Sequence, residues 1–230
     1  MRFLKWFIGL LLLPACIGVS RTIHGLLLQL SGGTWSGWSP DVWALLGGFV
    51  LWIFIYFVMP RPMRTYVLAH ELTHALWAWL MGVSVLGMKV SKRGGHVLLT
   101  KSNFLITLAP YFFPFYTLCV ILIHAVLSLF FDTSPYDAIW LGWVGLTWGF
   151  HLTFTLSMIK VGQSDIREHG ALFSYAIIYS FNLLGIGIWL VAVSDLTWTE
   201  WTHALGRDVS QTYLWLGEWI LHAVDWLAEA

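Results

Sequence analysis

Long runs of apolar residues alternate with short polar stretches along the 230 residues of the chain. The runs predict six helical segments, at about residues 3–19, 41–59, 65–82, 103–131, 138–160 and 170–194. A helix needs about 20 apolar residues to cross the hydrocarbon core of a bilayer, and several runs reach that length. The pattern therefore predicts an all-α polytopic membrane protein with about six transmembrane helices, and residues 20–40 either extend the first helix or lie at the interface.

Three stretches depart from a simple series of helices. Residues 83–102 alternate around Lys92-Arg93-Gly94-Gly95, which predicts a β-hairpin. Pro110 and Pro114 fall inside the fourth run and predict a kink. Residues 198–230 place five Trp among Glu, Asp and His, which predicts an amphipathic helix on the membrane surface. We therefore divide the chain into a transmembrane domain, residues 1–195, and an interfacial helix, residues 196–230.

The composition supports lipid as the main solvent. The chain is 58% hydrophobic and 10% charged, whereas a soluble domain carries about 25% charged residues. Its formal net charge is zero, so nothing indicates a nucleic-acid partner, and its two Cys imply no disulfide framework. We expect a multi-pass integral protein of a bacterial cell membrane, with the lipid bilayer as its surroundings.

One apolar run contains a pattern that is typical of a zinc site. Residues 70–74 read His-Glu-Leu-Thr-His, and on a helix His70 and His74 lie on one face, from which both imidazoles can reach one zinc ion. Glu71 is then placed to hold a water molecule and to take its proton during attack. Ionisable residues in an apolar run are costly and usually functional. The alternative is a polar patch that forms hydrogen bonds between helices.

A catalytic zinc takes three protein ligands, so a third must come from elsewhere. The candidates are His124, His151, Asp165, Glu168 and His169. We favour Asp165, in the polar loop before the sixth segment, and His151 is the next candidate. The alternative role for Asp165 is that of a capping box with Glu168, three residues further on.

The motif and its surroundings resemble the site-2 protease family of intramembrane metalloproteases. The similarity lies in Ala69-His70-Glu71-Leu72-Thr73-His74-Ala75, in Ala78, in Gly82-Val83-x-Val85 with the extended stretch after it, and in Thr107-Leu108-Ala109-Pro110. It covers about residues 65–115 and then Asp165. The resemblance implies a zinc-binding membrane helix, a hairpin that enters the membrane, and an Asp ligand from a later helix. The family's Asn-x-x-Pro pattern does not precede Asp165, and its PDZ-like insertion does not follow the hairpin.

The resemblance implies a membrane-protein substrate, cleaved where its helix unwinds near the zinc. The predicted hairpin offers a strand edge with which such a segment can pair. Two other classes stay open. A non-catalytic, zinc-stabilised membrane scaffold would hold its metal with four protein ligands, and a membrane di-iron oxidase would need several His clusters.

Overall fold

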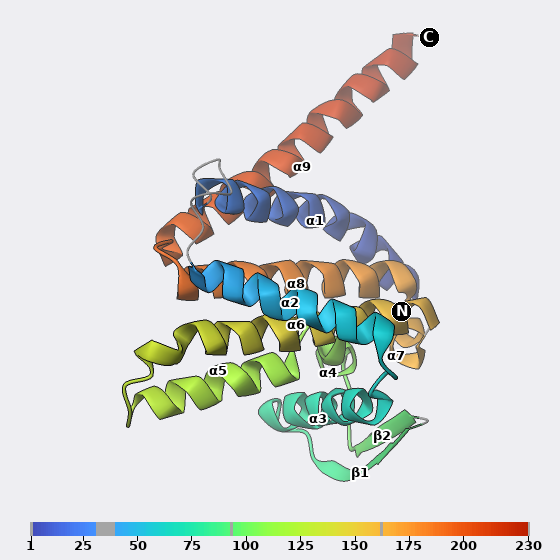
Figure 1. The fold of residues 1–230 in the computed structure, drawn as a ribbon. Helices are drawn as coiled ribbons and strands as arrows, with labels where there is room; N and C mark the ends of the chain where they lie inside the picture. The colour runs from blue at the N-terminus through green and yellow to red at the C-terminus, as the bar shows by residue number, and fades with distance from the viewer. Residues whose placement is uncertain (1, 31–39, 93, 162, 230) are drawn as a thin grey trace. The chain divides into compact units, whose positions relative to one another are not determined.

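The structure, a computed structural model, describes residues 2–30, 40–92, 94–161 and 163–229. It is mostly helical with one two-stranded antiparallel sheet, which confirms the all-α class and the hairpin. Arg93 of the predicted turn and residues 31–39 lie outside the described residues. The elements are α1 (Arg2–Leu30), α2 (Pro40–Val58), α3 (Met63–Leu80), β1 (Val85–Ser91), β2 (Gly94–Leu99), α4 (Phe104–Leu108), η2 (Ala109–Tyr111), α5 (Phe115–Ser128), η3 (Ser134–Tyr136), α6 (Asp137–Val161), α7 (Ser164–His169), α8 (Ala171–Val193) and α9 (Trp198–Glu229) (Figure 1).

Contacts divide the chain into two compact units. Unit 1 comprises residues 1–37 and 168–230, and unit 2 comprises residues 38–167. The division at residue 195 that we predicted from the sequence concerns placement relative to a membrane, and it stays a prediction.

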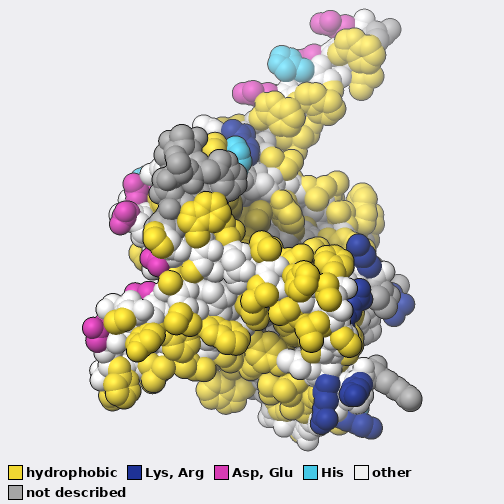
Figure 2. All heavy atoms as spheres, in the orientation of Figure 1, with side chains coloured by type: hydrophobic (Ala, Val, Ile, Leu, Met, Phe, Trp, Pro, Cys, Tyr) yellow, Lys and Arg dark blue, Asp and Glu magenta, His cyan; other side chains and the backbone are white. Residues whose placement is uncertain are grey.

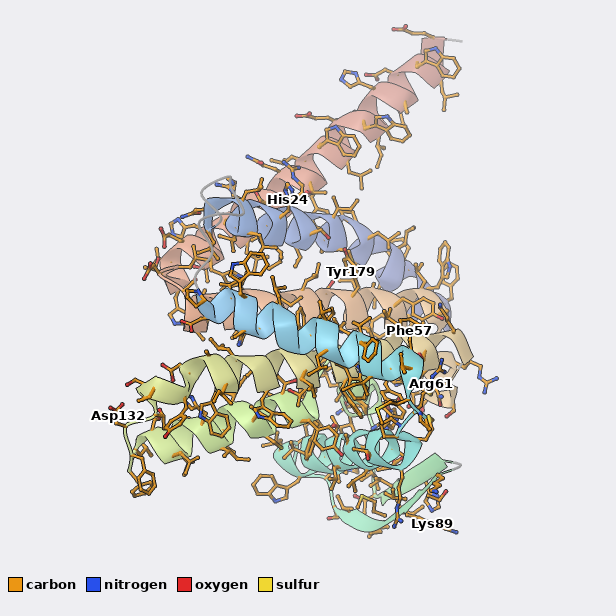
Figure 3. All side chains as sticks on the ribbon, viewed as in Figure 1. His24, Phe57, Arg61, Lys89, Asp132 and Tyr179 are labelled. Carbon is orange, nitrogen blue, oxygen red and sulfur yellow. The ribbon has the colours of Figure 1, made fainter. Side chains whose placement is uncertain are left out.

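Unit 1 is built from α1, α8 and α9, which pack at small residues. A Cβ atom on Gly9 would lie 2.7 Å from the backbone nitrogen of Phe173, and one on Gly18 would lie 2.6 Å from Cα of Val209. The hydroxyl of Tyr179, labelled in Figure 3, lies 2.8 Å from the hydroxyl of Ser20. Helix α1 continues to Leu30, beyond the apolar run that ended at residue 19 in the sequence, and Leu26 in this extension packs in a buried cluster with Leu190 and Val191.

Helix α9 starts from a capping box. The backbone amide of Thr197 donates to Glu200 Oε2, and the amide of Glu200 donates to the Thr197 hydroxyl, at 2.8 and 3.2 Å. In its second half Trp215, Trp219 and Trp226 are each at least 60% exposed. The helix that the sequence predicted is therefore present, and its position on a membrane surface stays a prediction.

In unit 2, α2 and α6 run parallel to each other in close contact. A Cβ on Gly145 would lie 1.9 Å from the carbonyl oxygen of Leu45, so glycine is required for this approach. Further along, Trp52 Nε1 donates to the Thr153 hydroxyl at 2.9 Å. The core of unit 2 forms here, around Trp52, Tyr56, Phe150 and Phe154.

The fourth apolar run is broken, as its prolines predicted. The segment Phe104–Tyr111 meets α5 at an angle of 81°. Asn103 caps α4 by accepting a hydrogen bond from the amide of Ile106 at 3.0 Å, and Pro110 and Pro114 prevent continuation into α5. The break turns η2 toward α3.

Within the described residues, three helices are long and apolar enough to cross a membrane, and the broken pair would be a fourth if it counts as one span. The three segments are Phe3–Leu30, Pro40–Val58 and Ala171–Ala192. In the face that Figure 2 shows, hydrophobic side chains cover much of α2 and α5, and Phe57 is 76% exposed. The two other predicted segments form α3 and α6, but their polar residues keep them from qualifying as spans, so six spans are not shown.

Candidate metal centre

The helix that carries the His-Glu-x-x-His pattern is bounded by local signals. Pro60 and Pro62 separate α3 from α2, and Met63 begins the helix. At the other end Gly82 adopts φ +69°, a left-handed conformation typical of the residue after a helix. Between these ends, residues 70 and 74 lie one turn apart on the same face.

His70, His74 and Asp165 could hold a metal ion. His70 Nε2 lies 3.2 Å from His74 Nε2, and Asp165 Oδ2 lies 3.4 Å and 3.7 Å from these two atoms. Zinc bound to imidazole nitrogen and carboxylate oxygen at about 2.0–2.2 Å in a tetrahedron places its ligand atoms about 3.3 Å apart. The three distances therefore fit a zinc-sized ion, and the donor types suit zinc.

Outer hydrogen bonds fix both imidazole rings. His74 Nδ1 lies 2.8 Å from the carbonyl oxygen of Ile106, which can only accept, so Nδ1 carries the proton and the Nε2 lone pair faces Asp165. His70 Nδ1 lies 3.2 Å from the hydroxyl of Tyr66, one turn earlier on α3. Metal-binding histidines usually have such a partner on the second nitrogen.

Asp165 reaches the histidines from the short helix α7. Tyr111 of η2 donates its hydroxyl hydrogen to Asp165 Oδ2 at 3.0 Å. The capping alternative does not describe the structure, because Asp165 lies inside α7 and α8 starts after Gly170.

Glu71 faces the hairpin, whereas the two histidines face Asp165. Its side chain is 6% exposed and lies against the hairpin, where a Cβ on Gly95 would be 2.8 Å from Glu71 Oε1. The hairpin pairs β1 with β2 in the register Lys89–His96 and Val90–Gly95. Lys89 is labelled in Figure 3, and Figure 2 shows Lys and Arg side chains gathered at this end of unit 2. Gly95 is therefore the residue that lets β2 approach the helix.

A small cavity of about 20 Å³ opens beside His70. It is lined by His70, Tyr66 and Thr73 of α3, by Thr147 and His151 of α6, and by aromatic residues of α5. A volume of about 10–15 Å³ suffices for one water molecule if polar partners are present. His151 thus borders the same cavity as His70 but does not join the group of His70, His74 and Asp165.

The remaining candidates have other partners. His124 Nε2 lies 3.3 Å from Asp137 Oδ1, at the other end of α6. Glu168 and His169 belong to unit 1, where His169 Nδ1 forms a hydrogen bond with Lys5. Within the described residues, His70, His74 and Asp165 form the one group of three or more His, Cys, Asp and Glu side chains that could hold a metal.

The sequence did not single out Tyr66, Tyr111 or Gly95. Tyr66 precedes His70 by four residues, so its helical spacing could have indicated it. Tyr111 and Gly95 meet the site through tertiary contacts, for which no local spacing exists. Tyr111 directly follows Ala109-Pro110, a place where the helix was expected to break.

Comparisons with protein-family models, with curated proteins and with solved structures found no match for this chain.

Proposed function

We propose that the chain is a zinc-dependent intramembrane protease of the kind seen in the site-2 protease family, with several membrane spans beyond the three apolar helices. The observation that carries this is the approach of Asp165 to His70 and His74 at distances that fit a tetrahedral ion. Two histidines and one carboxylate leave a fourth position open, as in catalytic zinc sites.

Each polar residue of the site has a part in this reaction. Zinc polarises a substrate carbonyl and lowers the pKa of water when it is bound at such a site. Glu71, next to the first ligand, takes the proton of the attacking water and passes it to the leaving amine. The cavity beside His70 has room for water close to the ligands. Tyr66, Thr147 and His151 in its lining offer polar partners for such a water, which a site in lipid would otherwise lack.

The hairpin supplies a place for the substrate. In a two-stranded sheet each strand has one outer edge without a strand partner. A substrate segment that has left its helix can add to such an edge through main-chain hydrogen bonds. Because β2 also lies against Glu71, pairing there would bring the peptide bond close to the proton acceptor.

The other two classes receive less support. A structural zinc site is closed by four protein ligands, and His151, the fourth ligand that a scaffold would need, does not join the group. A di-iron centre requires more ligands than the single three-residue group found within the described residues.

The decisive experiment compares wild type with Glu71→Gln in vesicles that also contain membrane proteins from an expression host. We expect new protein N-termini inside apolar helices with wild type and none with Glu71→Gln, while both proteins contain one zinc per chain. His70→Ala with His74→Ala should lose the zinc. Cleavage by Glu71→Gln at the wild-type rate would refute the mechanism, and equal zinc in the double variant would refute the site.

A further inference from the structure

The broken segment α4–η2–α5 supplies outer partners to two of the three candidate ligands. Ile106, in α4, offers its carbonyl oxygen to His74, and Tyr111, in η2, offers its hydroxyl to Asp165. We propose that Tyr111 is a positioning residue that fixes Asp165 as the third metal ligand. This proposal rests on the zinc site of the proposed function and adds a residue to it.

Asp165 needs a partner because its own helix cannot hold it in place. Helix α7 has six residues, and a helix this short is not stable without tertiary contacts. The Asp165 carboxylate therefore depends on its neighbours for its direction. Tyr111 donates to Oδ2, the same oxygen that faces both histidine nitrogens, and a carboxylate oxygen has a second lone pair left for a metal.

Tyr111 is itself held rigidly. Its side chain is fully buried, and its ring meets the His70 ring edge-on, with centroids 5.4 Å apart. One aromatic residue thus contacts one ligand with its ring and another with its hydroxyl. Hydrogen-bonded outer partners of ligands typically change metal affinity about 10–100-fold when they are removed.

A neighbouring tyrosine, Tyr116, provides a control that distinguishes a role of Tyr111 in positioning Asp165 from a role in packing alone. A buried tyrosine hydroxyl needs a hydrogen-bond partner wherever it lies, so the bond to Asp165 alone could serve stability. Tyr116, in α5, borders the cavity beside His70, but its hydroxyl donates to the backbone oxygen of Thr65 at 2.8 Å and not to a ligand. Tyr116→Phe is therefore a matched control that removes a hydroxyl near the site without touching Asp165.

The test measures zinc affinity of the full chain in detergent by competition with a chromophoric chelator. We expect Tyr111→Phe to bind zinc about 10–100-fold more weakly than wild type, and Tyr116→Phe to stay within about twofold. With cobalt in place of zinc, the visible absorption should change in Tyr111→Phe and stay unchanged in Tyr116→Phe, because only the first variant alters a ligand's direction. Thermal unfolding of both variants after metal removal serves as the check of the fold.

A double-mutant cycle decides whether Tyr111 acts through Asp165. In an Asp165→Ala background, where two histidines retain a weaker affinity, Tyr111→Phe should have no further effect. An equal loss in both backgrounds, or wild-type affinity of Tyr111→Phe, would overturn the proposal and leave the zinc site intact. A wild type without zinc affinity would overturn the zinc site as well. Zinc binding without any cleavage would overturn the protease function and not the role of Tyr111.

Discussion

The substitution Gly95→Ala, which adds one methyl group, should slow hydrolysis and leave metal binding unchanged. In Gly95→Ala the new Cβ would lie 2.7 Å from Glu71 Cγ, 2.8 Å from Glu71 Oε1 and 2.7 Å from the backbone oxygen of Lys89. Ordinary contacts of a Cβ atom start near 3.4 Å, so something must move by about 0.7 Å. The Lys89 oxygen belongs to the paired strand and cannot easily give way, and the displacement therefore falls on Glu71 or on the whole hairpin.

The expected decrease can be estimated for both the cleavage rate and the free energy of unfolding. Overpacking a well-packed position typically costs about 1–3 kcal/mol, and a misplacement of about 1 Å at a catalytic group can cost about 100-fold in rate. The three atoms nearest to a Cβ on Gly95 belong to Glu71 and Lys89 and not to a candidate ligand, so zinc content should stay at the wild-type level. We thus expect about 100-fold slower cleavage, full zinc and a modestly lower melting temperature.

The assay pairs zinc analysis and thermal unfolding with cleavage in vesicles, and Gly87→Ala is the control. Gly87 lies on the partner strand, and a Cβ there would find its nearest neighbour, Leu98 Cδ1, at 4.0 Å. Gly87→Ala should cleave like wild type. If Gly95→Ala also cleaves at the wild-type rate with full zinc, then the contact between β2 and Glu71 does not set the position of the proton acceptor.

Three further predictions concern other parts of unit 2. Asp165→Ala should bind zinc much more weakly and lose activity while His151→Ala keeps its zinc; the reverse result in zinc analysis would move the third ligand to His151. Val97→Pro, which removes a backbone donor from β2, should slow cleavage at constant zinc, and unchanged cleavage would make the hairpin purely structural. Gly145→Ala should lower the melting temperature, because its Cβ would lie 1.9 Å from a backbone oxygen of α2. The control is Gly47→Ala, whose new Cβ would have no neighbour within 4 Å, so its melting temperature should be unchanged or slightly higher. Equal melting temperatures for the two variants would contradict the close packing of α2 and α6.

The sequence predicted those features of the fold that depend on residues close together in the chain. The spacing of His70 and His74, the strand alternation around the hairpin turn and the two prolines of the fourth run all correspond to observed elements. Each depends on neighbours within a few residues, whose geometry is fixed by the helix or the strand period.

The contacts that complete the site are not local, and the sequence could only propose them. The sequence favours Asp165 by its residue type, by its place between apolar runs and by the resemblance to a family that uses an Asp from a later helix, with His151 as the alternative. Only the fold shows that Asp165 approaches both histidines. Tyr111 had no signal at all, because its role follows from the angle at which the broken segment turns. The number of spans stays a prediction for a related reason: the apolar runs at 65–82 and 138–160 form helices, and hydropathy alone does not distinguish lipid contact from protein contact.

Helix α3 has its polar side buried in the protein and apolar side chains exposed on its outer side. With 18 residues it is about 27 Å long, nearly enough for a bilayer core, and it fails as a span by composition. Its polar side is buried in the protein, since Glu71 is 6% exposed and the His70 side chain 11%. On the outside, Trp79 and Leu80 are 71% and 61% exposed. A helix of a soluble protein has the reverse arrangement, with apolar residues toward the core. A helix with ionisable groups inward and apolar groups outward is suited to lipid. The hairpin, η2 and α7 enclose the polar side of this helix, where the candidate metal group lies.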